Sequence, residues 1–91
     1  MKLTKADKSM HFKKIYNVFC HFTKSEAKNK DIVVYGTGFN DVPSAVVAKN
    51  LKEAGDEAEK FTGQSYGCEM KIEDLRNNAK KVTLAVYDFS Y

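Results

Sequence analysis

The 91-residue sequence has no tryptophan, one proline, two cysteines and a single arginine, Arg76. Two cysteines are too few for the disulfide framework of a small secreted domain. Bidentate recognition of guanine relies heavily on arginine, so a sequence-specific DNA-binding protein is not expected. No long apolar run is present, and neither a signal peptide nor a membrane-spanning helix is predicted. The expected location is the cytoplasm, with no membrane partner and with a Cys20–Cys68 bridge disfavoured.

Hydrophobic residues make up 43% of the sequence and charged residues 30%, which is typical of a folded domain rather than a disordered segment. The length predicts a single domain over residues 1–91. Six phenylalanines and five tyrosines carry much of the apolar content. The abundance of lysine, asparagine, phenylalanine and tyrosine, with little arginine, suggests an AT-rich coding genome such as that of a phage.

The net charge of +3 is unevenly distributed. Residues 1–30 contain eight lysines and two acidic residues, a local charge of +6, whereas residues 31–91 have a charge of −3. A basic segment on an acidic body can attract an acidic partner, either nucleic acid or protein.

A long helix is predicted from about residue 43 to residue 62. Pro43 suits a first turn, Asn40 or Asp41 can cap it, and Gly63 follows its end. The apolar positions repeat at helical spacing: Val47, Leu51, Ala54, Ala58 and Phe61. This segment is therefore expected to pack one face against a sheet.

Three strands are predicted around this helix. Residues 31–35 are apolar at almost every position, which indicates a central strand. Residues 65–72 alternate between polar and apolar, with Tyr66, Cys68, Met70 and Ile72 on one face. Residues 76–79 are expected to form a turn, and residues 82–91 a final strand that pairs with 65–72 as an antiparallel hairpin.

The segment 10–23 fits both a strand and a helix. Phe12, Ile15, Tyr16, Phe19 and Cys20 match helical spacing, whereas the density of β-branched and aromatic residues favours a strand. The strand is preferred, with the helix as the alternative. The predicted fold class is thus α+β: a three- to four-stranded, mostly antiparallel sheet packed against one long helix.

No catalytic, metal-binding or cofactor-binding residues are assigned. Gly36-Thr37-Gly38 lies between a strand and the expected helix, but the loop lacks the further glycine or lysine of a phosphate-binding motif. Cys20 and His21 are adjacent, so on a strand they point to opposite faces and cannot form a dyad. The acidic residues are interleaved with lysines, which is typical of a solvated face.

The predicted function is that of a small non-enzymatic binding protein, one that regulates or inhibits another macromolecule through protein–protein contact. One helix covers only one side of the predicted sheet, which leaves an aromatic patch exposed at Tyr87, Phe89 and Tyr91. The partner is another protein or a second copy of the chain in a homodimer. The alternative is binding of single-stranded nucleic acid or RNA, with phosphate contacts from Lys5, Lys8, Lys13 and Lys14.

Overall fold

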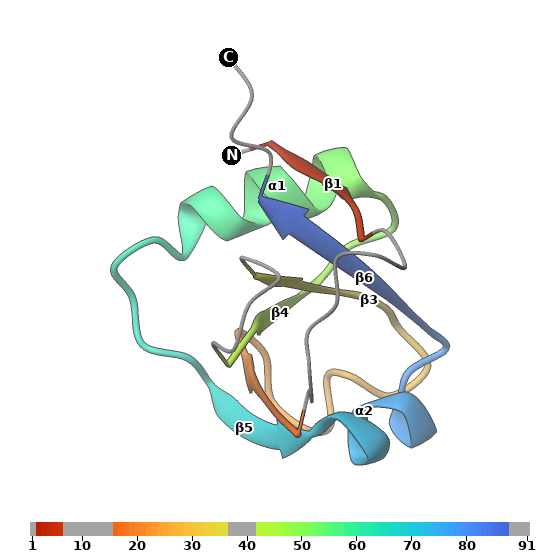
Figure 1. The fold of residues 1–91 in the computed structure, drawn as a ribbon. Coiled ribbons are helices and arrows are strands. Elements are labelled where there is room, and N and C mark those ends of the chain that lie inside the picture. The colour runs from red at the N-terminus through yellow and green to blue at the C-terminus, as the bar shows by residue number, and fades with distance from the viewer. Residues whose placement is uncertain (1, 7–15, 37–41, 88–91) are drawn as a thin grey trace.

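The computed structural model describes residues 2–6, 16–36 and 42–87. These residues form, in chain order, β1 (Leu3–Lys5), β2 (Asn17–Cys20), β3 (Asp31–Gly36), β4 (Ser44–Val47), α1 (Leu51–Lys60), β5 (Cys68–Lys71), α2 (Ile72–Asn78) and β6 (Lys81–Tyr87). The strands join in one mixed sheet of order β1-β6-β3-β4-β2-β5 (Figure 1). Within the described ranges, no helix is long and apolar enough to cross a membrane.

Strand β3 lies in the interior of the sheet, as its apolar sequence predicts. It runs parallel to β6 and antiparallel to β4. Strand β4 continues the sheet through a parallel pairing with β2, and β2 pairs with β5 in antiparallel register. The prediction of a central strand at residues 31–35 is confirmed, and five of the six residues of β3 are buried.

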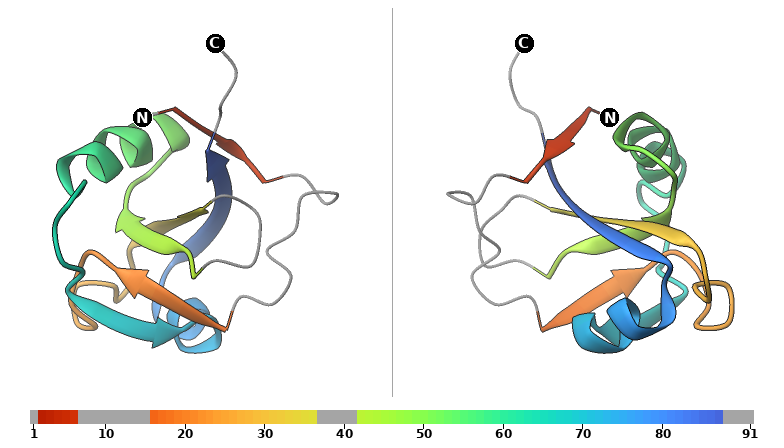
Figure 2. Two further views of the ribbon diagram at one scale, coloured as in Figure 1. Left: turned by 60° about the vertical axis from the view of Figure 1, so that its left-hand side comes forward. Right: turned by 90° about the vertical axis from the view of Figure 1, so that its right-hand side faces the viewer.

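The two faces of the sheet are covered by different helices (Figure 2). On one face, Val33 and Val46 pack with Ala54 and Ala58 of α1. The other face places Val34 in a core cluster that includes Leu75 of α2. Helix α1 contacts β1 and β4, and α2 contacts β5 and β6. The helices thus lie at opposite ends of the twisted sheet, which Figure 1 shows at its top and bottom.

The predicted architecture was wrong in its sheet and in its long helix. The sheet has six strands and is mixed, and residues 44–47 of the expected helix form β4. The β-branched pair Val46-Val47 fills a strand position beside β3, where its register partners are Val33 and Ile32. The helix begins only after Asn50, whose side-chain oxygen accepts a hydrogen bond from the Glu53 backbone N–H at 2.8 Å.

The C-terminal half also differs from expectation. Strands β5 and β6 do not form the predicted hairpin, since β5 pairs with β2 while β6 pairs with β1 and β3. Residues 76–78 belong to α2 rather than to a turn. That helix buries Leu75, with Ile72 and Ala79 partly buried at helical spacing around it.

The ambiguous segment and the final strand are described only in part. Residues 17–20 form a strand, as preferred, while residues 10–15 lie outside the described ranges. Strand β6 ends at Tyr87, and residues 88–91 lie outside them as well. The sheet does not have the one fully uncovered face that was predicted, because α1 packs on one face and α2 on the other.

Candidate functional site: an aromatic cleft

A cleft of about 290 Å³ opens beside the C-terminal end of α1 and is lined by residues of β2, β3, β4 and β6. We call it the aromatic cleft. Six of its ten lining residues carry aromatic rings, and none of the ten is a lysine, arginine, aspartate or glutamate. The lining residues are Phe19, His21, Tyr35, Ser44, Ala58, Phe61, Thr62, Gln64, Tyr66 and Tyr87.

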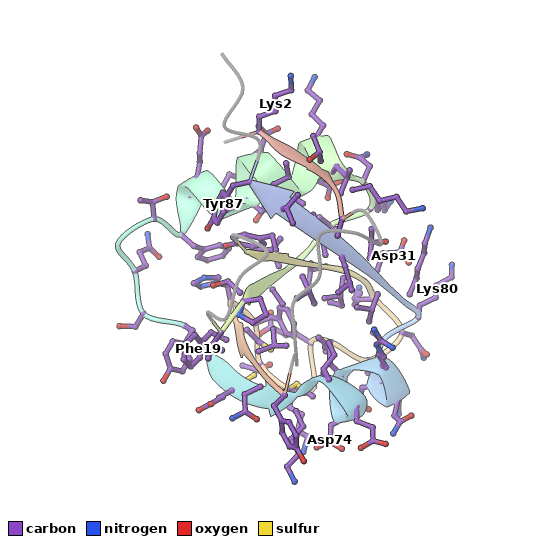
Figure 3. All side chains as sticks on the ribbon, in the orientation of Figure 1. Lys2, Phe19, Asp31, Asp74, Lys80 and Tyr87 are labelled. Carbon is purple, nitrogen blue, oxygen red and sulfur yellow. The ribbon has the colours of Figure 1, made fainter. Side chains whose placement is uncertain are left out.

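The six rings form three contacting pairs. Phe19 stacks on Tyr66 with ring centroids 4.4 Å apart, and His21 stacks on Phe61 at 4.6 Å. The third pair, Tyr35 and Tyr87, meets edge to face at 5.9 Å with the ring planes 89° apart. Figure 3 shows Phe19 and Tyr87 on the same side of the molecule. Such pairs stabilise aromatic clusters beyond the burial of their area, so the walls of the cleft are held in place by one another.

Pairing of the strands explains how these distant residues meet. Ser44 is the register partner of both Phe19 on β2 and Tyr35 on β3, which places three cleft residues in one row across the sheet. Directly opposed side chains on neighbouring strands point to the same face. The row therefore continues the face that α1 covers, beyond the point where α1 ends.

The phenols of Tyr35 and Tyr87 are neutral at physiological pH. Burial, with a further contribution from Tyr87, raises the pKa of Tyr35 to about 12, although a hydrogen bond with Ser44 opposes this shift. Burial also raises the pKa of Tyr87. Both hydroxyls are thus uncharged groups that can donate or accept a hydrogen bond.

His21 adds a second neutral polar group. Burial lowers the pKa of its imidazole. Its Nδ1 atom is buried and has no hydrogen-bond partner among the described residues. The ring is held instead by its stack on Phe61 and by the His21 backbone N–H, which donates to the Ala45 carbonyl at 2.9 Å. His21, Tyr35 and Tyr87 therefore add no charge to the cleft.

The position of Tyr66 in the cleft depends on Gly67, where the backbone passes close to the residues that follow β2. The Gly67 N–H donates to the Cys20 carbonyl at 2.7 Å. A Cβ atom at Gly67 would lie 3.1 Å from the Phe22 carbonyl oxygen, which is tighter than most Cβ contacts and would require a small backbone shift. This approach lets the chain turn before β5 starts. Tyr66 therefore stacks on Phe19 and is 47% exposed, and does not share the core face of Cys68 as the alternation predicted.

Cys20 and His21 lie on opposite sides of the sheet, as the strand interpretation requires. His21 lines the aromatic cleft, whereas Cys20 is fully buried in the core cluster with Val18 and Met70. The Cys20 thiol donates to the Val18 carbonyl at 3.6 Å, and burial, followed by the neighbouring Cys68, raises its pKa to about 12. In the described ranges, no group of three or more histidines, cysteines or acidic residues is placed to hold a metal ion.

The predicted protein-binding residues are partly described. Tyr87 lies in the aromatic cleft, while Phe89 and Tyr91 lie outside the described residues. The other cleft residues were not predicted as binding residues: Tyr35 lies in the predicted central strand and Phe61 on the apolar face of the predicted helix. Only the alternation of Phe19 and His21 with Val18 and Cys20 signalled two different faces.

Of the predicted nucleic-acid contacts, only Lys5 lies within the described residues, where it is exposed on β1. Lys8, Lys13 and Lys14 lie outside them.

A different set of lysines lies where the 24–30 turn meets the start of β6. The Asn29 N–H donates to the Asn78 carbonyl and the Lys80 N–H to the Lys30 carbonyl, at 3.0 and 2.9 Å. Lys80 lies across the molecule from Phe19 in Figure 3, so this basic surface is separate from the aromatic cleft.

Comparison of the chain with protein-family models, with curated proteins and with solved structures gives no match.

Proposed function

We propose that the chain is a non-enzymatic, cytoplasmic binding protein that regulates or inhibits another protein by receiving one of its aromatic side chains in the aromatic cleft. The observation that carries this proposal is the chemistry of the lining: six rings, neutral hydroxyl and amide groups, and no lysine, arginine or carboxylate. Aromatic residues dominate the centres of protein–protein interfaces, where they fill desolvated pockets on the partner.

The size of the cleft supports a single side chain as its occupant. Its volume of about 290 Å³ lies at the lower limit of the ~300–1,000 Å³ typical of sites for cofactors and drug-sized ligands. A phenol or indole ring can stack on exposed Tyr66 while its polar atom hydrogen-bonds to Ser44, Thr62 or Gln64.

Charge favours a protein partner over nucleic acid. Single-strand binding surfaces combine stacking rings with a basic groove that follows the phosphates. Helix α1, which supplies Ala58 to the cleft and ends just before Phe61, carries four acidic residues and two lysines. One of those lysines, Lys60, is already paired with Glu57 at 3.0 Å. Phosphates near the cleft would therefore meet a net negative helix.

The test compares two exposed tyrosines, one that lines the aromatic cleft and one that does not. Tyr66→Ala removes an exposed ring of the cleft, and Tyr16→Ala removes a ring that is 70% exposed outside it. Each variant and the parent chain are used to capture binding proteins from the source cell after nuclease treatment. We expect one protein to bind the parent and Tyr16→Ala equally, and to bind Tyr66→Ala at least about tenfold more weakly.

The salt dependence of binding and the oligomeric state of the chain distinguish a protein partner from nucleic acid and from a second copy of the chain. Affinity for the captured protein should change little with salt, whereas nucleic-acid binding would weaken steeply as phosphate contacts are screened. Partners that disappear after nuclease treatment, or that bind both tyrosine variants equally, contradict the proposal. Sedimentation of the purified chain identifies a second copy as the partner if Tyr66→Ala alone dissociates a dimer.

A further inference from the structure

The two cysteines face each other across neighbouring strands. Cys20 of β2 and Cys68 of β5 are direct partners in the antiparallel register. Opposed residues in such a pair have Cα atoms ~4.5–5.5 Å apart and side chains on one face. That spacing falls within the ~4.4–6.8 Å range of disulfide-bonded cysteines. Cys20 belongs to the core cluster against which Cys68 packs, and the Cys68 side chain is close enough to affect the pKa of Cys20.

The two thiols differ in their access to solvent. Both cysteines are free, with Cys20 buried and Cys68 partly exposed. Cys68 lines a surface hollow of about 390 Å³ together with two lysines and two acidic residues, Lys24, Lys71, Glu69 and Asp74. Its thiol donates to the Phe22 carbonyl at 3.1 Å. A small reagent in the hollow can therefore meet the Cys68 sulfur before it meets that of Cys20.

We propose that Cys20 and Cys68 form a reversible disulfide by exchange with a low-molecular-weight disulfide that enters at Cys68. The Cys68 thiol loses its proton, and its thiolate attacks one sulfur of the reagent, which breaks the reagent's S–S bond and releases one thiolate. The deprotonated Cys20 sulfur then attacks the Cys68 sulfur, forms the Cys20–Cys68 bond and releases the second thiolate. The two cysteines are oxidised by two electrons, and the reagent is reduced to two thiols that take up the two protons.

The bridge connects the two segments that form one wall of the aromatic cleft. Phe19 and His21 flank Cys20, and the chain passes from Tyr66 through Gly67 to Cys68. The bridge therefore fixes the spacing of β2 and β5 beside the stack of Phe19 on Tyr66. The consequence for binding rests on the function proposed above, but the formation of the bridge does not.

The test measures the covalent state of the full chain. The folded protein is incubated with oxidised glutathione, quenched in acid and weighed intact without reduction. We expect a monomer that has lost two hydrogen atoms and carries no glutathione. A chain that stops at a glutathione adduct, forms a cross-linked dimer, or keeps both thiols under conditions that oxidise the urea-unfolded chain overturns the proposal.

Two variants check the order of the steps. Cys20→Ser should accumulate one glutathione on Cys68, because the resolving thiol is absent. Cys68→Ser should remain unmodified while folded, since Cys20 is buried. Modification of Cys20 in the folded Cys68→Ser variant would contradict initial attack on glutathione by Cys68. If either variant fails to fold, the mass of the parent chain alone decides whether the bridge forms.

Amide shifts separate this inference from the function. Bridge formation should move the amide resonances of Phe19, Gly67 and Tyr66 in the NMR spectrum of the parent chain. A bridge that forms while no protein binds the cleft leaves the redox inference standing and removes the proposed function. Binding of a protein at the cleft without formation of the bridge supports the proposed function and overturns the redox inference.

Discussion

The two sides of strand β2 show how four residues can serve both a closed core and an open site. Val18 and Cys20 are fully buried and face the cluster completed by Leu75 of α2. Phe19, between them in sequence, points to the other side and lines the aromatic cleft, as does His21 just beyond the strand. The period of two along a strand makes this separation possible.

The difference between the sides lies in what covers them. On the closed side, α2 supplies a large aliphatic side chain, Leu75, that is fully buried. On the cleft side, α1 presents the small residues Ala54, Gly55 and Ala58 to the sheet and ends at Lys60. Tyr35 belongs to the same core cluster as Ala54 and Ala58, while Phe19, His21 and Tyr66 lie outside that cluster and line the cleft. The closed side is therefore expected to stabilise the fold, and the cleft side to bind.

Truncation on the two sides should separate their roles. Val18→Ala removes two fully buried methyl groups and should lower the free energy of unfolding by roughly 2 kcal/mol. Tyr66→Ala, at a half-exposed ring, should lower it by no more than about 1 kcal/mol. Urea denaturation of both variants measures the two effects. Equal losses, or a larger loss for Tyr66→Ala, would show that the cleft is part of the stabilising core.

A smaller change in the free energy of unfolding is expected from pH, through His21 on the cleft side. Because burial lowers the pKa of folded His21, the unfolded chain binds the proton more tightly. Stability from this residue is complete above the ordinary histidine pKa of 6.5 and falls as the pH decreases below it. The expected result is a lower urea midpoint at about pH 5.5 than at about pH 7.5.

His21→Phe is the matched control, since it keeps a ring on Phe61 and removes the titrating group. The midpoint of this variant should change less between the two pH values. An equal change in both proteins would assign the pH dependence to other groups, including His11.

Part of this fold follows from local sequence. The apolar run of β3 predicts a central strand, and the alternation after Gly67 predicts β5. The start of α1 was also present in the sequence, because Asn50 followed three residues later by Glu53 is a capping pattern. The predicted helix nevertheless started at Pro43, because the helical spacing of apolar residues was taken to include Val47, which lies in β4.

The pairing of distant strands could not be derived in the same way. Neither Cys20 nor Cys68 carries a signal that β2 pairs with β5, and the hairpin of neighbouring segments was the simpler expectation. The aromatic cleft depends on that pairing, since it brings Tyr66 against Phe19. It depends equally on the β2–β4 and β3–β4 registers that align Phe19, Ser44 and Tyr35.

The most direct test of the aromatic cleft is to map a single indole onto the protein. N-acetyl-tryptophanamide is titrated into the isotope-labelled chain, and adenosine 5′-monophosphate is titrated separately as a nucleobase with a phosphate. Because the chain has no tryptophan, fluorescence of the indole reports the same binding independently. We predict that the indole shifts the resonances of Phe19, Ser44, Phe61 and Tyr66, and that the nucleotide binds there more weakly. Shifts confined to the lysines at residues 28–30 and 80–81, or stronger binding of the nucleotide in the cleft, would contradict the assignment of this cleft to an aromatic side chain of a protein.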